Sequence, residues 1–230
     1  RFTQFASAAT LEALEHANFK IDESNRDRVG ILIGTGIGGI ITLLEQYDVL
    51  RARGPERVSP FLIPMMISDS AAGNIAIRVG ARGPNMSLAT ACASGTNALG
   101  EAAEMIRRGS ADVMIAGASE ASITAVSMAG MNVMTALSTR NDDPQRASRP
   151  FDKDRDGFLM GEGAGILILE SLEHAQARGA NILCEFGGYG TTDDAHHISA
   201  PAENGAGAAI SMSLALENAR LKPADIGYIN

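Results

Sequence analysis

The sequence has 230 residues, of which 45% are hydrophobic and 20% are charged, and its formal net charge is −8 at pH 7. This composition predicts a soluble globular protein with a sizeable core, and the acidic balance argues against nucleic-acid binding. The apolar runs are too short to cross a bilayer and no signal peptide is apparent, so we expect no membrane contact. The two cysteines form no disulfide framework, which favours the cytoplasm or an organelle matrix.

Apolar runs of strand length alternate with helical patterns along the chain. The regions with helical spacing are residues 5–18, 40–54, 93–108, 172–180 and 211–220. The runs of strand length are residues 28–34, 85–90, 111–119, 163–171 and 181–186, and a further strand is expected to begin at residue 226. This alternation predicts an α/β fold with a mainly buried sheet. No linker, repeat or low-complexity tract divides the chain, so we expect one domain over residues 1–230.

The glycine loop GTGIGG (34–39) satisfies the G-x-G-x-x-G pattern and lies between a predicted strand and a predicted helix. That context suits a dinucleotide site, which also needs an acidic residue about 20 residues further on. The sequence has three prolines in residues 53–64, and Glu56 is badly placed for a ribose. The glycines are therefore expected to make room for another backbone or an acyl chain, and a nucleotide site stays the alternative.

The segment DKDRDGFLMGEG (152–163) imitates a calcium loop through its alternating aspartates. The twelfth position, which must supply a bidentate carboxylate, is Gly163, and Glu162 comes one residue early. We therefore expect turn-forming acids here and no metal.

Cys92 follows a predicted strand and precedes a helix rich in small residues. Unpaired N–H groups and the helix dipole favour a thiolate at such a position, and Gly95 and the flanking alanines leave room for a substrate. The arrangement is that of a nucleophile elbow with sulfur in place of serine. Cys184, on the predicted strand 181–186, has no helix N-terminus and is expected to be the less reactive thiol.

Several stretches of the sequence together resemble one known family. The segment TACASGTNALGEA (90–102) looks like the active-site segment of β-ketoacyl-acyl-carrier-protein synthases, the condensing enzymes of fatty acid elongation. Residues 136–170 match the type II synthase pattern, and residues 199–207 and 225–230 continue it in order. The resemblance implies a thiolase-like α/β fold of mixed sheets with layered helices, of which this chain is mainly the N-terminal half, a partial single domain.

The resemblance also implies an acyltransferase activity. Cys92 matches the nucleophile that accepts an acyl group from acyl carrier protein, and its backbone N–H would be half of the oxyanion hole. Malonyl carrier protein then loses carbon dioxide, and the resulting carbanion attacks the acyl-enzyme to give a 3-oxoacyl product. The substrates arrive on the phosphopantetheine arm of the carrier, so no further cofactor and no metal are implied.

Further positions match binding residues of that family. Ile37, Leu62 and Ala91 correspond to positions that line the acyl pocket. Phe158 and Ser199 correspond to residues around the phosphopantetheine tunnel, where the family more often has threonine in place of Ser199.

The resemblance implies two protein partners. Arg57 matches a basic position for docking the carrier, although Glu56 and Thr135 stand where relatives often place arginine. The synthases are homodimers in which a strand near the nucleophile pairs with its symmetry mate, and residues 85–90 are the candidate.

No histidine of the chain matches the catalytic pair of the family. His196 and His197 fall in a segment that matches a loop, and His16 and His174 lie on predicted helices. We therefore expect the chain by itself to be inactive in condensation.

Three other functions stay open at this point. One is a ketosynthase of a polyketide pathway, and one is a nucleotide-binding domain built on residues 34–39. The third is a non-catalytic subunit that resembles a chain-length factor; the nucleophile is usually replaced there, so Cys92 counts against it.

Overall fold

The computed structural model describes residues 1–230, and its centre is a mixed sheet of four strands in the order β2-β1-β3-β4. The strands are β1 (Val29–Gly34), β2 (Asn85–Leu88), β3 (Val113–Glu120) and β4 (Gly163–Glu170). β1 runs parallel to β2 and β3, whereas β4 runs antiparallel to β3. The predicted α/β class is confirmed.

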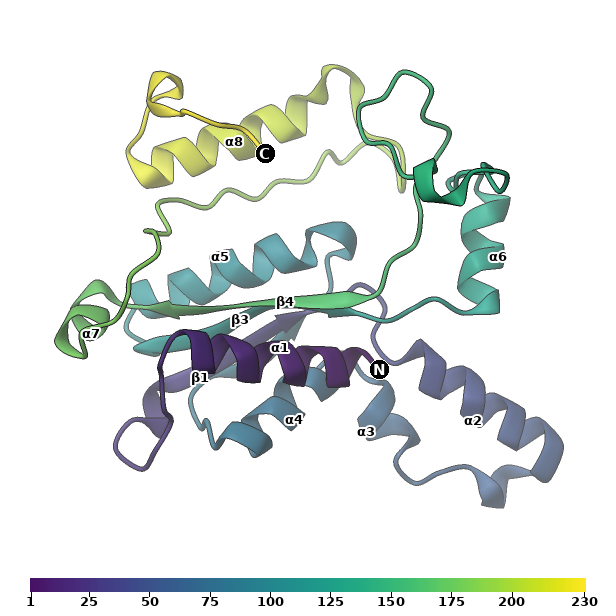
Figure 1. Ribbon diagram of the computed structural model, residues 1–230, viewed down its shortest axis with the longest axis horizontal. Coiled ribbons are helices and arrows are strands. Elements are labelled where there is room, and N and C mark those ends of the chain that lie inside the picture. The colour runs from purple at the N-terminus through teal and green to yellow at the C-terminus, as the bar shows by residue number, and fades with distance from the viewer.

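Helices cover both faces of this sheet. The helices are α1 (Phe2–His16), α2 (Ile40–Arg53), α3 (Leu62–Met66), α4 (Ser70–Val79), α5 (Ser94–Arg107), α6 (Ala125–Val133), α7 (Leu172–Ala177) and α8 (Ala206–Ala219). Short 3-10 turns are η1 (Arg26–Arg28), η2 (Pro55–Arg57), η3 (Ala91–Ala93), η4 (Pro144–Arg146), η5 (Glu203–Gly205) and η6 (Pro223–Asp225). α1 and α4 pack on one face of the sheet and α5 packs on the other (Figure 1). None of the helices has both the length and the apolar character that crossing a bilayer requires.

The core follows from the alternation of side chains along the strands. Ile31, Ile33 and Ile115 are fully buried and face α1 and α4. Leu32 and Met114, one residue along in each strand, are buried on the opposite face against α5. Burying each such side chain contributes about 1.5–3 kcal/mol, so β1 and β3 anchor the sheet between the two helix layers.

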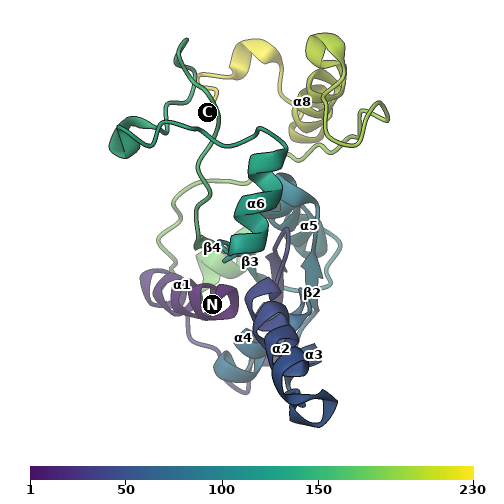
Figure 2. The ribbon, with the colours of Figure 1, turned by 90° about the vertical axis from the view of Figure 1, so that its right-hand side faces the viewer.

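The chain leaves this body after α7 and runs across α5 to reach α8 (Figures 1 and 2). The ring of Tyr189 lies on Gly100 of α5, where an added Cβ would be 2.3 Å from a ring carbon. On its other side the segment lies against α8, since a Cβ on Gly188 would be 2.2 Å from the Ala215 carbonyl oxygen. The segment is therefore sandwiched between two helices.

Two strand predictions in this part of the chain are wrong. Residues 181–186 and 226–230 contain no strand, and Cys184 lies in an exposed extended stretch. An apolar run becomes a strand only when a neighbour supplies hydrogen bonds to its backbone. No strand pairs with either segment here.

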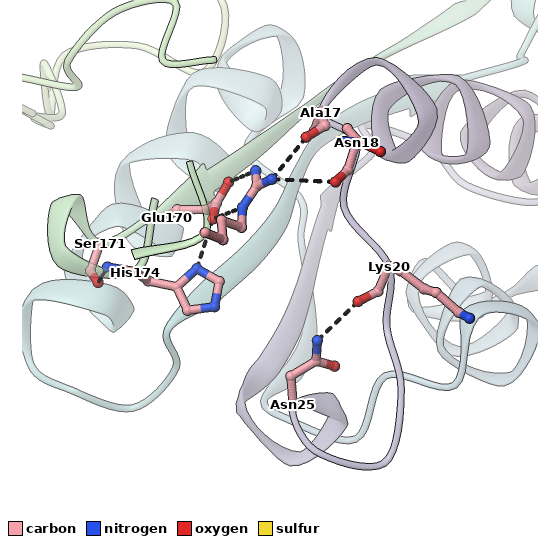
Figure 3. A network of polar contacts seen from close by, with 8 residues as sticks. Ala17, Asn18, Lys20, Asn25, Glu170, Ser171 and His174 are labelled. Atoms are coloured by element: carbon pink, nitrogen blue, oxygen red, sulfur yellow. Dashed lines mark hydrogen bonds and ion pairs between the residues drawn. The ribbon is translucent and has the colours of Figure 1, made fainter. Parts of the chain in front are cut away.

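A polar network attaches α1 to the far end of β4 (Figure 3). Arg178 donates two hydrogen bonds to the carboxylate of Glu170 and one to the carbonyl oxygen of Ala17. The ring of His174 meets the same carboxylate, with 2.7 Å between Nδ1 and Oε2. Burial acts to raise the pKa of Glu170, but the hydrogen bonds from Arg178 and His174 outweigh it and hold that pKa below its ordinary value.

Candidate active site

Cys92 lies on the turn that joins β2 to α5. The turn is η3, directly before the first residue of α5, and the thiol is exposed. The preceding residue, Ala91, has φ +50°, a left-handed conformation that a residue with a Cβ adopts only under constraint. The turn therefore presents the cysteine at a helix N-terminus, as the sequence predicts.

The side chain of Ser94 holds this strained turn in place. Its hydroxyl donates to the carbonyl oxygen of Ala91 at 2.6 Å and accepts from the backbone N–H of Thr90 at 3.0 Å. Ser94 itself is buried. The backbone on both sides of Ala91 and Cys92 is thus fixed by one side chain from the first turn of α5.

A second set of contacts links the cysteine turn to the segment after α7. The hydroxyl of Thr90 donates to the side-chain oxygen of Asn97 at 2.6 Å. The amide nitrogen of Asn97 donates to the hydroxyl of Tyr189, also at 2.6 Å, and lies 3.4 Å from Thr191 Oγ1. This chain of hydrogen bonds spans 92 residues of sequence between Asn97 and Tyr189.

The glycine loop packs directly on the cysteine turn. A Cβ on Gly34 would lie 2.4 Å from the Ser94 carbonyl oxygen, and a Cβ on Gly36 would lie 3.7 Å from Cα of Ala91. A Cβ on Gly39 would lie 2.5 Å from the carbonyl oxygen of Met65 in α3. The prediction that these glycines make room for other backbone is confirmed for Gly34 and Gly39, whereas the nearest atom to a Cβ on Gly36 would be Oε2 of Glu120, at 3.1 Å.

The same loop lacks the free donors that a dinucleotide needs. The backbone N–H groups of Gly36 and Ile37 donate to Oε2 of Glu120 at 2.9 and 3.0 Å. A pyrophosphate, which is negatively charged, would have to displace the negatively charged carboxylate of Glu120 from these N–H groups. The nucleotide interpretation of residues 34–39 is therefore not supported.

Sequence reasoning missed Glu120. It lies at the end of β3 and accepts hydrogen bonds from the glycine loop, although 84 residues of sequence separate it from Gly36. The only signal in the sequence is an acidic residue at the end of a buried apolar strand.

Three predicted site residues gather around the loop and the turn. Ile37 lies within the loop and is 46% exposed, and Ala91 adjoins Cys92. Leu62 begins α3, which contacts the loop because the N–H of Gly39 donates to the carbonyl oxygen of Met66 at 2.9 Å.

The other three predicted site residues make no hydrogen bond to the cysteine turn. Arg57 is exposed at the end of η2, and Ser199 is exposed with its N–H donating to Nδ1 of His197. Phe158 is paired with the backbone at Leu137 and borders a cavity of about 470 Å³ that Arg149 and Arg155 also line.

The aspartates of residues 152–163 act as turn acceptors. The Ser138 hydroxyl and the Thr139 N–H donate to Asp156, and these bonds hold the pKa of its carboxyl below the ordinary value of 3.8. Asp152 accepts from the N–H of Asp154 at 2.7 Å. No cluster of three or more histidine, cysteine or acidic residues is arranged to hold a metal.

The fold and the cysteine turn define a thiolase-like α/β protein with an exposed cysteine directly before a helix that packs on the sheet. Residues 1–175 match the family model described as beta-ketoacyl synthase, N-terminal domain, and residues 183–230 match that of the C-terminal domain. The chain belongs to the beta-ketoacyl synthase family. The two family models meet between residues 175 and 183. The expectation of one domain over residues 1–230 stays a prediction.

Individual relatives agree with this assignment. The chain is 53% identical to 3-oxoacyl-[acyl-carrier-protein] synthase 2 of Staphylococcus aureus and 54% identical to the protein of that name from Synechocystis. Both alignments cover all of this chain and 57% and 55% of the relatives. A type II polyketide ketosynthase, solved in complex with its acyl carrier protein, superposes with a TM-score of 0.93 at 36% identity, over 100% of this chain and 58% of the other. The chain thus spans a little over half the length of these relatives.

Proposed function

We propose that this chain carries the acyl-accepting centre of a 3-oxoacyl-[acyl-carrier-protein] synthase of fatty acid elongation. The observation that carries the proposal is the exposed Cys92 on a strained turn at the N-terminus of α5. A helix N-terminus favours negative charge, and the substrate has open access to the thiol.

In the first half-reaction, Sγ of Cys92 bonds to the carbonyl carbon of an acyl thioester on the carrier. The phosphopantetheine sulfur leaves and takes up a proton, so the acyl group is held as a thioester on the protein. The backbone N–H of Cys92 supplies one donor to the oxyanion of the tetrahedral intermediate. In the second half-reaction, a malonyl carrier loses carbon dioxide and its carbanion attacks this thioester, which releases Cys92 and a 3-oxoacyl carrier.

Different residues then contact different parts of the substrate. Ile37, Leu62 and Ala91 border the acyl chain, which their grouping around the glycine loop supports. Phe158 and Ser199 contact the phosphopantetheine arm. No cofactor beyond that arm takes part.

Arg57 is proposed to dock the acyl carrier protein. Its exposed position on η2 leaves the guanidinium free to meet an acidic surface. The related polyketide ketosynthase solved with its carrier supports a carrier as partner. We also propose that the protein is cytoplasmic and forms a homodimer through β2.

The histidines of this chain are not proposed to assist the condensation. His174 is engaged by Glu170, and Nδ1 of His197 accepts from the N–H groups of Ser199 and Ala200. The chain alone is therefore expected to accept an acyl group without releasing carbon dioxide from a malonyl carrier.

A ketosynthase of a polyketide pathway is the second candidate. The likeness to the type II polyketide ketosynthase favours it. The two candidates differ in the product: a single 3-oxoacyl carrier supports elongation, and a carrier bearing several unreduced keto groups supports the polyketide pathway.

The proposed nucleophile is tested by alkylation of the native protein with limiting iodoacetamide near neutral pH. Cys92 and Cys184 are both exposed, so reagent access does not explain a difference in their alkylation rates. The helix N-terminus beside Cys92 does. Peptide mapping should show Cys92 modified at least about tenfold faster than Cys184. Equal rates, or a preference for Cys184, would remove the observation on which the proposal depends.

A further inference from the structure

The carboxylate of Glu120 fixes the backbone of the glycine loop from the end of β3. Oε2 accepts from the N–H groups of Gly36 and Ile37, and Oε1 lies 3.4 Å from the hydroxyl of Thr35. The Thr35 hydroxyl in turn accepts from the N–H of Gly38 at 3.1 Å. Four consecutive residues of the loop are thus held by one carboxylate and one hydroxyl.

This carboxylate has no cationic partner. No ion pair of the structure includes Glu120, and its other neighbour is the N–H of Ala121 at 3.3 Å. Hydrogen bonds from backbone N–H groups to an ionised carboxylate are stronger than those between neutral groups. Apart from the contact with Ala121, the hydrogen bonds of Glu120 all fix the conformation of this loop.

The loop shape matters because the loop contacts the nucleophile turn on both sides of Cys92. Gly34 lies against Ser94, and Gly36 lies against Ala91. Ile37 follows Gly36 directly and donates its own N–H to Glu120. A change in the Glu120 contacts would move the Ile37 side chain relative to the thiol.

We propose that Glu120 is a positioning residue for acyl transfer: it fixes the loop that carries Ile37 against the Cys92 turn and so sets which acyl chain lengths the site accepts. The inference deepens the proposed function and rests on it. Glu120 touches no reacting atom and acts through Ile37.

The test measures acylation of Cys92 by a short-chain and a long-chain saturated acyl carrier thioester in the complete protein, by intact mass. Glu120→Ala removes the acceptor and should change the ratio of the two rates by about tenfold. Glu120→Gln keeps an amide oxygen in reach of both N–H groups and should change the ratio by about threefold, an intermediate effect. If Glu120→Ala does not fold, the intermediate change in Glu120→Gln is the deciding measurement.

Two further variants separate positioning from general stability. In a Ile37→Ala background, Glu120→Ala should add little to the change in the ratio, since both substitutions act on one side chain. Asp112→Asn, at the other end of β3, breaks the pair with Arg28 and should lower stability without changing the ratio.

The outcomes are distinct for the two proposals. An unchanged ratio in the Glu120 variants, or a change that is fully additive with Ile37→Ala, would overturn the positioning role while the acyl transfer stands. A wild-type protein that takes no acyl group on Cys92 overturns the proposed function, and the inference falls with it.

Discussion

Gly34, the last residue of β1, packs against the first turn of α5. An added methyl group would lie 2.4 Å from a backbone oxygen of Ser94, which cannot rotate away as a side chain can. We predict that Gly34→Ala lowers the free energy of unfolding by about 1–3 kcal/mol, the range for overpacked sites. Chemical denaturation of the two proteins measures this difference.

Gly73 provides the matched control for that substitution. It lies inside α4, and no atom lies within 4 Å of the position its Cβ would take. Gly73→Ala should therefore raise stability by up to about 1 kcal/mol through helix propensity alone. If both alanines have the same effect, the close approach at Gly34 is not what requires a glycine there.

The sequence indicates the glycine pattern but not what each glycine meets. The strand before residues 34–39 and the helix after them are both found as predicted, and so is the cysteine at a helix N-terminus. Glu120 could not be assigned, because hydrogen bonds from the loop to a residue 84 positions away leave no local pattern. The sequence thus predicts the position of Cys92 before α5, but not the carboxylate that fixes the neighbouring loop.

Among the elements, the network of Glu170, Arg178 and His174 ties the C-terminal end of α1 to the end of β4 (Figure 3). The pKa of Glu170 is lowered in the folded protein, so its contribution is present above the ordinary value of 4.5 and is lost as pH falls through the lowered pKa. We predict that Glu170→Gln lowers stability at pH 7 by about 2–3 kcal/mol. The difference from wild type should shrink as the pH is lowered below 4.5.

Glu173, in the first turn of α7, is the control for this measurement. It is exposed and takes part in no ion pair or side-chain hydrogen bond, so Glu173→Gln should change stability by less than about 0.5 kcal/mol at any pH. Denaturation curves at several pH values test both variants. A Glu170→Gln deficit that stays constant down to low pH would contradict the assigned titration.

Most elements of the sheet body are found from their patterns, but α3, α4 and α6 are not among the predictions. α4 begins with Ser70 and contains Gly73 and Asn74, which lower helix propensity, and packing of Ala72 and Ile75 against the sheet overcomes this. The strand predictions for residues 181–186 and 226–230 are wrong for the opposite reason: the apolar patterns are present, but no neighbouring strand pairs with these segments. In both cases the contacts with other elements determine the secondary structure, and the spacing of apolar residues gives no information about those contacts.

For the whole molecule, β2 is one of the two edge strands of the sheet and the proposed site of dimerisation. The carbonyls of Pro84 and Leu88 accept from β1, so Ser87 directs its backbone N–H away from β1. We predict a dimer by light scattering for the complete protein, and a monomer for Ser87→Pro, which removes that outward N–H.

Ser87→Ala controls for the side chain, whose hydroxyl lies 3.0 Å from that of Ser68. This variant loses the same side-chain contact and keeps the N–H, so it should stay dimeric. A monomeric wild type, or a Ser87→Pro protein as dimeric as Ser87→Ala, would rule out pairing through β2.

The fate of an acyl group supplied on acyl carrier protein tests most directly whether Cys92 accepts it. After incubation, intact mass and peptide mapping should find one acyl thioester, located on Cys92, and Cys92→Ala should abolish it. The 230-residue chain alone, given malonyl carrier as well, should release no carbon dioxide. An acyl group that survives in Cys92→Ala, or that is found on Cys184, would contradict the central claim that the turn before α5 carries the nucleophile.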